Sequence, residues 1–234
     1  MKRFYATASV TGDGPFGVAL DGKPLRTPAR ALLAVPTRAL ADAVAAEWQG
    51  QGEKIDPRSL PLTGLANAAI DRVAADHAGF ARRLATYAES ELIAYRADGP
   101  ASLLAAQAAA WDPWVEWLSR RYDVGLTMTT GIMHVAQPPA TLARVQAAFA
   151  AFTPFQLAPL DPIVTITGSA VLALAVAAGE LEAQAAYDMA HVDARWQEEQ
   201  WGRDPLAEKA EATRRADLDA AVRFLRLLPP ADAA

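Results

Sequence analysis

The stretch ALLAVPTRALADAVAAEW, residues 31–48, contains the change of pattern that decides the fold. Its first five residues, 31–35, form a short apolar run that is typical of a strand. Pro36 ends this run, and Thr37 is suited to cap a helix because its side-chain oxygen can accept a hydrogen bond from the first turn. Apolar residues then recur at helical spacing, at Leu40, Val44 and Trp48. The stretch predicts that a β segment gives way to helix at about Pro36.

The residues before this stretch predict a small antiparallel sheet. Residues 3–10 and 16–21 have strand-like patterns, and the intervening Gly12-Asp13-Gly14-Pro15 indicates a turn. Asp21-Gly22 predicts a tight turn of type I′, after which residues 23–27 continue extended.

The residues after this stretch predict helices separated by Gly and Pro. Asp112-Pro113 indicates the start of a new helix, with Asp112 as the cap and Pro113 in the first turn. A later strand is expected over residues 127–135. Further helices are expected at about residues 65–73, 79–95, 102–110, 138–152, 163–178, 181–201 and 205–228.

This order of elements predicts an α+β protein with two domains. Residues 1–58 are expected to form a small antiparallel β-containing N-terminal domain with one helix, and residues 59–228 a larger all-helical C-terminal domain. The tail, residues 229–234, is short and rich in small residues, and we expect it to be disordered.

Composition restricts the class of protein. The 234 residues include no cysteine, which excludes disulfides, thiolate chemistry and Cys-ligated zinc. The formal net charge of −5 argues against a nucleic-acid partner. The most apolar stretch, residues 163–178, is short for a membrane span and is expected to be a buried helix. Residues 1–5 resemble neither a secretory signal nor an organellar presequence, so we expect a bacterial cytoplasmic protein, with a mature mitochondrial form as the alternative.

Sequence motifs for common chemistries are missing. The chain has no P-loop, no dinucleotide-binding glycine motif after a strand and no Gly-x-Ser-x-Gly elbow. Its histidines, at positions 77, 134 and 191, are far apart and lack the spacing of metal ligands. We therefore expect no cofactor, no metal and no catalytic residue.

The run from His191 to Gly202 combines two tryptophans with several charges. If residues 181–201 form one helix, a single apolar stripe joins Ala185, Met189, Val192 and Trp196. Asp193 then lies about 60° around the helix from Trp196, at the border of that stripe. A carboxylate beside aromatic residues suits recognition of a partner's Arg or amide, but an ordinary helix flank has the same composition, and the run alone leaves both open.

A set of short motifs is spread in order along most of the chain: 20–28 (LDGKPLRTP), 46–49 (AEWQ), 61–63 with 65–71, 95–97, 107–114, 131–132, 137–138, 167–169 and 201–202. Together these motifs resemble the Atp12 chaperones, which are assembly factors of the F1 ATP synthase. No single motif is specific for the family, but the order and spacing of the motifs between about Phe4 and Ala207 make the resemblance specific.

The resemblance implies a non-enzymatic protein that binds the free α subunit of F1, shields the surface that later contacts β subunits, and is released as the α/β hexamer forms. It implies no stable membrane insertion, a monomer, and a mitochondrial matrix location for eukaryotic relatives. The Glu47-Trp48 pair matches a family motif, and Asp193 matches an acidic position important in the family. Ala194 stands where the family often has a second acid, so Asp193 supplies the charge. Partner contacts are accordingly expected at Asp193, Trp196, Trp48 and Glu47, although Trp48 could instead pack between the domains.

Two other classes stay open on the residues themselves. A small-molecule enzyme would have a site between the domains that uses Asp193, His191 and Arg96. A generic interaction module would have the same surface and a different client.

Overall fold

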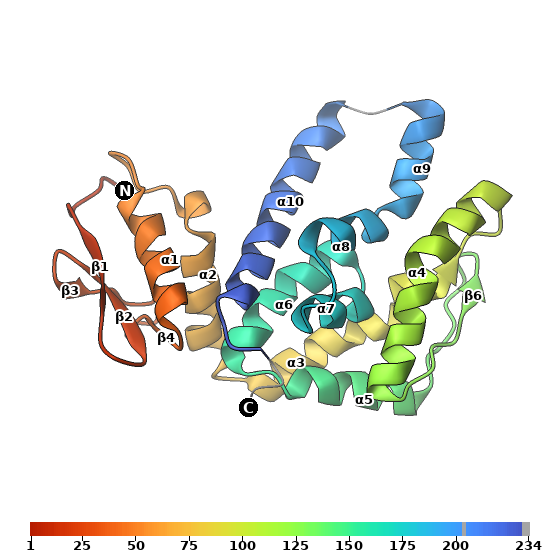
Figure 1. The fold of residues 1–234 in the computed structure, drawn as a ribbon, viewed down its shortest axis with the longest axis horizontal. Coiled ribbons are helices and arrows are strands. Elements are labelled where there is room, and N and C mark those ends of the chain that lie inside the picture. The colour runs from red at the N-terminus through yellow and green to blue at the C-terminus, as the bar shows by residue number, and fades with distance from the viewer. Residues whose placement is uncertain (203–204, 231–234) are drawn as a thin grey trace. The chain divides into compact units, whose positions relative to one another are not determined.

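The computed structural model describes residues 1–202 and 205–230, which fall into two compact units (Figure 1). Unit 1 consists of Met1–His77, Phe152–Pro159 and the described part of Ala220–Ala234, and unit 2 of Ala78–Ala151 and the described part of Leu160–Asp219. The predicted α+β class is confirmed. A domain boundary at residue 58 stays a prediction, and the contacts add later helical segments to the N-terminal unit. Of the tail predicted to be disordered, residues 231–234 lie outside the described residues.

The sheet of unit 1 is antiparallel, as expected. Strand β2 (Phe16–Leu20) is its centre, and it pairs with β1 (Ala8–Thr11), β3 (Lys23–Pro24) and β4 (Ala34–Val35). The turn between β2 and β3 has positive φ at both central residues, 47° at Asp21 and 77° at Gly22. This is the type I′ geometry that the Asp-Gly pair predicts.

Helix α1 (Arg38–Gln49) packs on this sheet and completes the core of unit 1. The Thr37 hydroxyl accepts a hydrogen bond from the Leu40 amide, which confirms the predicted cap. The 3₁₀ turn η1 (Pro57–Ser59), helix α2 (Pro61–Ala68) and the π turn η2 (Ala69–Val73) follow. The core includes apolar residues from the sheet, from both helices and from the end of the chain: Val18, Leu33, Val35, Leu40, Val44, Leu62, Phe224 and Leu228.

Unit 2 is built mainly of helices. The elements from residue 77 on are α3 (His77–Ala85), η3 (Thr86–Ser90), η4 (Leu92–Ala94), β5 (Tyr95–Arg96), α4 (Ala101–Tyr122), β6 (Thr129–Thr130), α5 (Pro139–Ala150), α6 (Pro154–Thr167), α7 (Ala170–Ala177), α8 (Ala183–Ala190), α9 (Val192–Trp201) and α10 (Pro205–Arg226). Helices α6 and α10 contribute residues to both units. Strands β5 and β6 pair in parallel.

Several predicted boundaries are wrong. Asp112-Pro113 does not start a helix, because α4 continues through Pro113, whose ring is exposed to solvent. The apolar stretch 163–178 is largely buried as expected, with Thr165 exposed, but Gly168, with φ 66°, divides it between α6 and α7. No helix within the described residues is long and apolar enough to cross a membrane.

Three other segments differ from their predictions. The helix predicted for residues 79–95 ends at Ala85 and continues as the 3₁₀ turns η3 and η4. The strand predicted for 127–135 shrinks to two residues. The helix predicted for 181–201 is interrupted at His191, whose φ of −118° and ψ of 25° are not helical.

Candidate functional site

The centre of the candidate site is the carboxylate of Asp193, in the first turn of α9. Asp193 is exposed, and its Oδ1 accepts a hydrogen bond of 2.8 Å from the side-chain amide of Gln107 on α4. Gln107 is buried, and its oxygen accepts a hydrogen bond of 2.9 Å from the backbone amide of Ala97. A buried amide whose nitrogen and oxygen both form hydrogen bonds has little freedom to move, so Gln107 holds the exposed Asp193 carboxylate in position.

Neighbouring contacts hold α8 and α9 against α4. The indole nitrogen of Trp111, a fully buried residue, donates to the backbone oxygen of Met189 over 2.8 Å. On α9, the indole nitrogen of Trp196 donates to the Ser102 hydroxyl over 3.2 Å. The Trp196 ring also meets the ring of Trp201 edge-on, with centroids 6.0 Å apart. Asp193 and Trp196 therefore belong to one helix that packs on the N-terminal half of α4.

The outward side of α9 is left to solvent. The helix buries none of its ten residues, and Trp201 is 74% exposed. Leu104 on α4 is also an exposed apolar residue. Aromatic and apolar side chains beside a fixed carboxylate are typical of surfaces that bind another protein.

The predicted stripe through Ala185, Met189, Val192 and Trp196 does not form. It requires one continuous helix, and the break at His191 turns α9 away from the direction of α8. The buried side of α8 consists of Ala183, Ala186 and Tyr187 instead.

A charged network surrounds this break. The carboxylate of Asp188 contacts the guanidinium groups of Arg195 and Arg215. The guanidinium group of Arg215 also lies over the ring of Tyr187, 4.1 Å from its centroid. The His191 ring stacks on the same Tyr187 ring, with centroids 3.9 Å apart. The network joins α8, α9 and α10, and it gives one charged residue of the run from His191 to Gly202, Arg195, a partner.

Glu47 and Trp48 lie in unit 1, whereas Asp193 and Trp196 lie in unit 2. The Glu47 carboxylate accepts hydrogen bonds from the backbone amides of Leu62 and Thr63 and from the Thr63 hydroxyl, at 2.7–2.9 Å. These are the free donors of the first turn of α2, so Glu47 caps that helix from a neighbouring one. Burial raises the pKa of Glu47, and these hydrogen bonds oppose the shift.

Trp48 is half-buried within unit 1. Its indole nitrogen donates to the Thr63 hydroxyl over 3.1 Å, and its ring packs edge-on against Tyr5 with centroids 5.8 Å apart. The Tyr5 hydroxyl in turn donates to the Trp48 backbone oxygen. The family motif Glu47-Trp48 thus fastens α1 to α2 and to the N-terminal segment.

The residues of the alternative enzyme site each have other partners. Arg96 forms an ion pair of 2.7 Å with Asp112 and lies over the Trp111 ring. His191 contacts the Tyr187 backbone oxygen through Nδ1. Among residues 1–202 and 205–230, no hydrogen bond or ion pair is found that joins Arg96, His191 and Asp193 to one another, and no cluster of three or more His, Asp or Glu could hold a metal ion.

Sequence reasoning missed a buried carboxylate, Glu91. It is fully buried, and its Oε2 accepts hydrogen bonds from the amides of Ala170 and Val171, which begin α7. Burial raises the pKa of Glu91 to about 7, although the hydrogen bonds from Ser169 and the backbone favour the charged form. The two amides are 79 and 80 residues away in sequence, so no local pattern indicates the pairing.

Known proteins resemble the chain along its length. A family model described as ATP12 chaperone protein matches residues 2–119. The crystal structure of Atp12 from Paracoccus denitrificans is 40% identical, with a TM-score of 0.91 and coverage of 97% of both chains. The Atu1473 protein of Agrobacterium tumefaciens is 39% identical, with a TM-score of 0.92 over 97% of this chain and 86% of the other. Protein atp12, mitochondrial, of Schizosaccharomyces pombe is 23% identical over 86% of this chain and 74% of its own. The chain belongs to the ATP12 chaperone family.

Proposed function

We propose that this protein is an ATP-independent assembly chaperone that binds the free α subunit of the F1 ATP synthase. It shields the interface of that subunit until the α/β hexamer forms, and it acts as a monomer in the bacterial cytoplasm. Membership of the ATP12 chaperone family supports the chaperone role. Unassembled subunits expose apolar patches that aggregate, and covering such a patch needs binding only, with no chemical step.

The observation that carries the proposal is the fixed carboxylate of Asp193 on a helix without buried residues. Holding Asp193 through Gln107 lowers the entropy lost when a partner's Arg or backbone amide binds it. Trp196 and Trp201 lie on the same helix and supply apolar contact area. The carboxylate and the two tryptophans together suit a moderately polar interface, from which a partner with higher affinity for α can displace the chaperone.

Release follows from a difference in affinity. The β subunit buries the complete interface of α in the hexamer, whereas the chaperone covers only part of it, so β displaces the chaperone when it is available. The direction of assembly then needs no nucleotide hydrolysis by the chaperone.

Glu47 and Trp48 have a different part in this proposal. Their hydrogen bonds with Leu62 and Thr63 support a structural role within unit 1 instead of direct contact with α. Substituting either residue would lower the amount of folded chaperone, which reduces assembly without removing a partner contact.

The experiment that tests the proposal mixes the purified chain with isolated F1 α subunit and separates the products by size-exclusion chromatography with light scattering. We expect a one-to-one complex that protects α from aggregation and dissociates when β subunit is added. A chain that leaves α aggregating and elutes alone contradicts the proposal. Capture of another client in its place would support the generic interaction module.

A further inference from the structure

Strands β5 and β6 are followed by a loop, residues 131–137, whose tip is apolar and exposed. Ile132 is 97% exposed and Met133 is 77% exposed, and Met128 just before β6 is 41% exposed. Large apolar side chains that cluster at one exposed position mark contact sites more often than scattered ones do. This tip is on a different segment from Asp193 and Trp196.

The loop is held in place at several points. The backbone amide of Gly131 donates to the Arg96 oxygen over 2.8 Å, which extends the pairing of β5 with β6. At the far end, the buried Gln137 exchanges two hydrogen bonds with the Thr127 backbone, at 2.8 and 3.0 Å. The Tyr95 hydroxyl bridges His134 Nδ1 and the Val135 amide. The apolar tip is therefore presented in a defined position.

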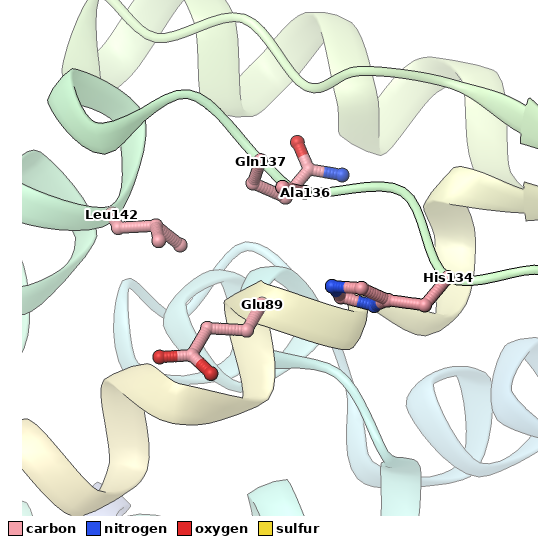
Figure 2. A pocket seen from close by; sticks show the side chains of 5 residues that line it. All are labelled: Glu89, His134, Ala136, Gln137 and Leu142. Carbon is pink, nitrogen blue, oxygen red and sulfur yellow. The ribbon is translucent and has the colours of Figure 1, made fainter.

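A pocket of about 150 Å³ lies beside the loop, lined by Glu89, His134, Ala136, Gln137 and Leu142. Figure 2 shows the His134 ring and the Leu142 side chain pointing toward one another, with Glu89 of η3 below them in this view and its carboxylate turned away from His134. Sites for small-molecule ligands usually measure about 300–1,000 Å³. This pocket has the size of one amino-acid side chain.

One polar group of the pocket, the Glu89 carboxylate, favours a cation. The amide of Gln137 is already satisfied by Thr127. Glu89 is exposed, and within residues 1–202 and 205–230 no hydrogen bond or ion pair to its carboxylate is found. The preceding helix α3 carries Arg82 and Arg83 in its last turn, and Arg83 is paired with Asp161 at 2.8 Å. Leu142 and Ala136 offer an apolar wall for the methylene stem of a Lys or Arg side chain.

From this geometry we propose that the loop 131–137 and Glu89 form a second contact surface, which binds a protein segment carrying a Lys or Arg flanked by apolar residues. The basic side chain enters the pocket and pairs with Glu89, and its apolar neighbours cover Ile132 and Met133. Naming the segment as part of F1 α rests on the function proposed above. The surface is separate from the Asp193 carboxylate, so the two can be tested independently.

The test measures the affinity of the full chain for isolated F1 α subunit by titration calorimetry. The double variant Ile132→Ser with Met133→Ser should weaken binding about tenfold, and Glu89→Gln about threefold, with a smaller dependence on salt than the wild type. Leu32→Ser, which changes an apolar residue that is 54% exposed in unit 1, is the matched control and should bind as the wild type. Melting temperatures confirm that each variant is folded.

The outcomes separate this surface from the proposed function. If the loop and Glu89 variants bind α with wild-type affinity while Asp193→Asn binds more weakly, the proposal of a second contact surface is wrong and the proposed function is supported. If the wild type does not bind α, the proposed function fails, and NMR titration with the synthetic peptides Ac-Ala-Leu-Lys-Leu-Ala-amide and Ac-Ala-Leu-Glu-Leu-Ala-amide decides on the surface. Shifts of the Ile132, Met133 and His134 signals with the lysine peptide alone support it, and equal or absent shifts overturn it.

Discussion

The side-chain amide of Gln107 donates a 2.8 Å hydrogen bond to the carboxylate of Asp193, so a buried residue of α4 fixes an exposed charge on α9. The oxygen of the same amide accepts from the Ala97 backbone at 2.9 Å. The amide cannot rotate without losing both bonds. The position of the carboxylate is therefore set by the core of unit 2.

Replacing Gln107 by Met, which has a similar volume, should disturb both stability and binding. The Ala97 amide loses its acceptor, and we expect the free energy of unfolding to fall by about 1–3 kcal/mol. Affinity for F1 α should fall about threefold, because Asp193 is present but no longer held. Denaturant titration and calorimetry measure the two effects.

The control for this variant is Gln200→Met, which changes an exposed amide on α9. It should leave stability and affinity unchanged. If Gln107→Met loses stability and still binds α with wild-type affinity, the amide has no positioning role.

Glu47→Ala should act through stability. It removes the acceptor of two backbone amides at the start of α2 and of the Thr63 hydroxyl. We expect a loss of about 2 kcal/mol in the free energy of unfolding, since a lost cap costs about 0.5–2 kcal/mol and the bonds are to a charged group. The folded fraction should bind α normally. If Glu47→Ala has normal stability but does not bind α, Glu47 contacts the partner directly and the structural role is wrong.

Glu91 predicts a dependence of stability on pH. Its pKa is raised from 4.5 to about 7 in the folded protein, so the folded state keeps a proton that the unfolded state loses between these values. The stability from this group is full below the unfolded pKa and is lost as pH rises toward the folded pKa. Between about pH 4.5 and pH 7.5, the loss should be on the order of 3 kcal/mol.

The comparison for Glu91 is the variant Glu91→Gln, which keeps an acceptor for Ala170 and Val171 and does not titrate. Its unfolding free energy should fall less than that of the wild type over the same pH range. Parallel curves for the two proteins would show that Glu91 keeps an ordinary pKa.

Pro113→Ala should stabilise the protein. Pro113 lies inside α4, is exposed, and cannot donate a hydrogen bond to the carbonyl of the preceding turn. Proline inside a helix costs about 3 kcal/mol relative to alanine. The helix around Pro113 is already adapted to the proline, so the substitution recovers only part of this free energy. We expect a gain of about 1 kcal/mol by thermal unfolding with unchanged affinity for α. A destabilised variant would show that the packing of α4 requires the proline.

Local features were predictable where local physics decides them. The Thr37 cap and the Asp21-Gly22 turn follow from a few neighbouring residues, and both are present. Pro113 misled because burial of the Trp111 and Leu118 side chains on either side outweighs one lost hydrogen bond. The predicted single helix over 181–201 failed for a related reason, because side-chain contacts of His191 with Tyr187 stabilise the break.

The candidate site was predictable only in part. The family resemblance selected Asp193, the helical pattern of the run from His191 to Gly202 selected Trp196, and the structure places both on α9. Gln107 and Glu91 were out of reach, because their partners lie 86 and about 80 residues away and only the fold brings them together. Trp117 on α4 is likewise buried and donates to Glu180, 63 residues away, over 2.7 Å.

The affinity of Asp193→Asn for isolated F1 α subunit tests the central claim most directly. Asparagine keeps an oxygen that can accept from Gln107 and removes only the charge, so the fold should be unchanged. We predict about tenfold weaker binding at an unchanged melting temperature, because the charge-assisted contact with the partner is lost. Glu199→Gln, which neutralises another exposed carboxylate on α9, should bind as the wild type. Wild-type affinity for Asp193→Asn would contradict the account.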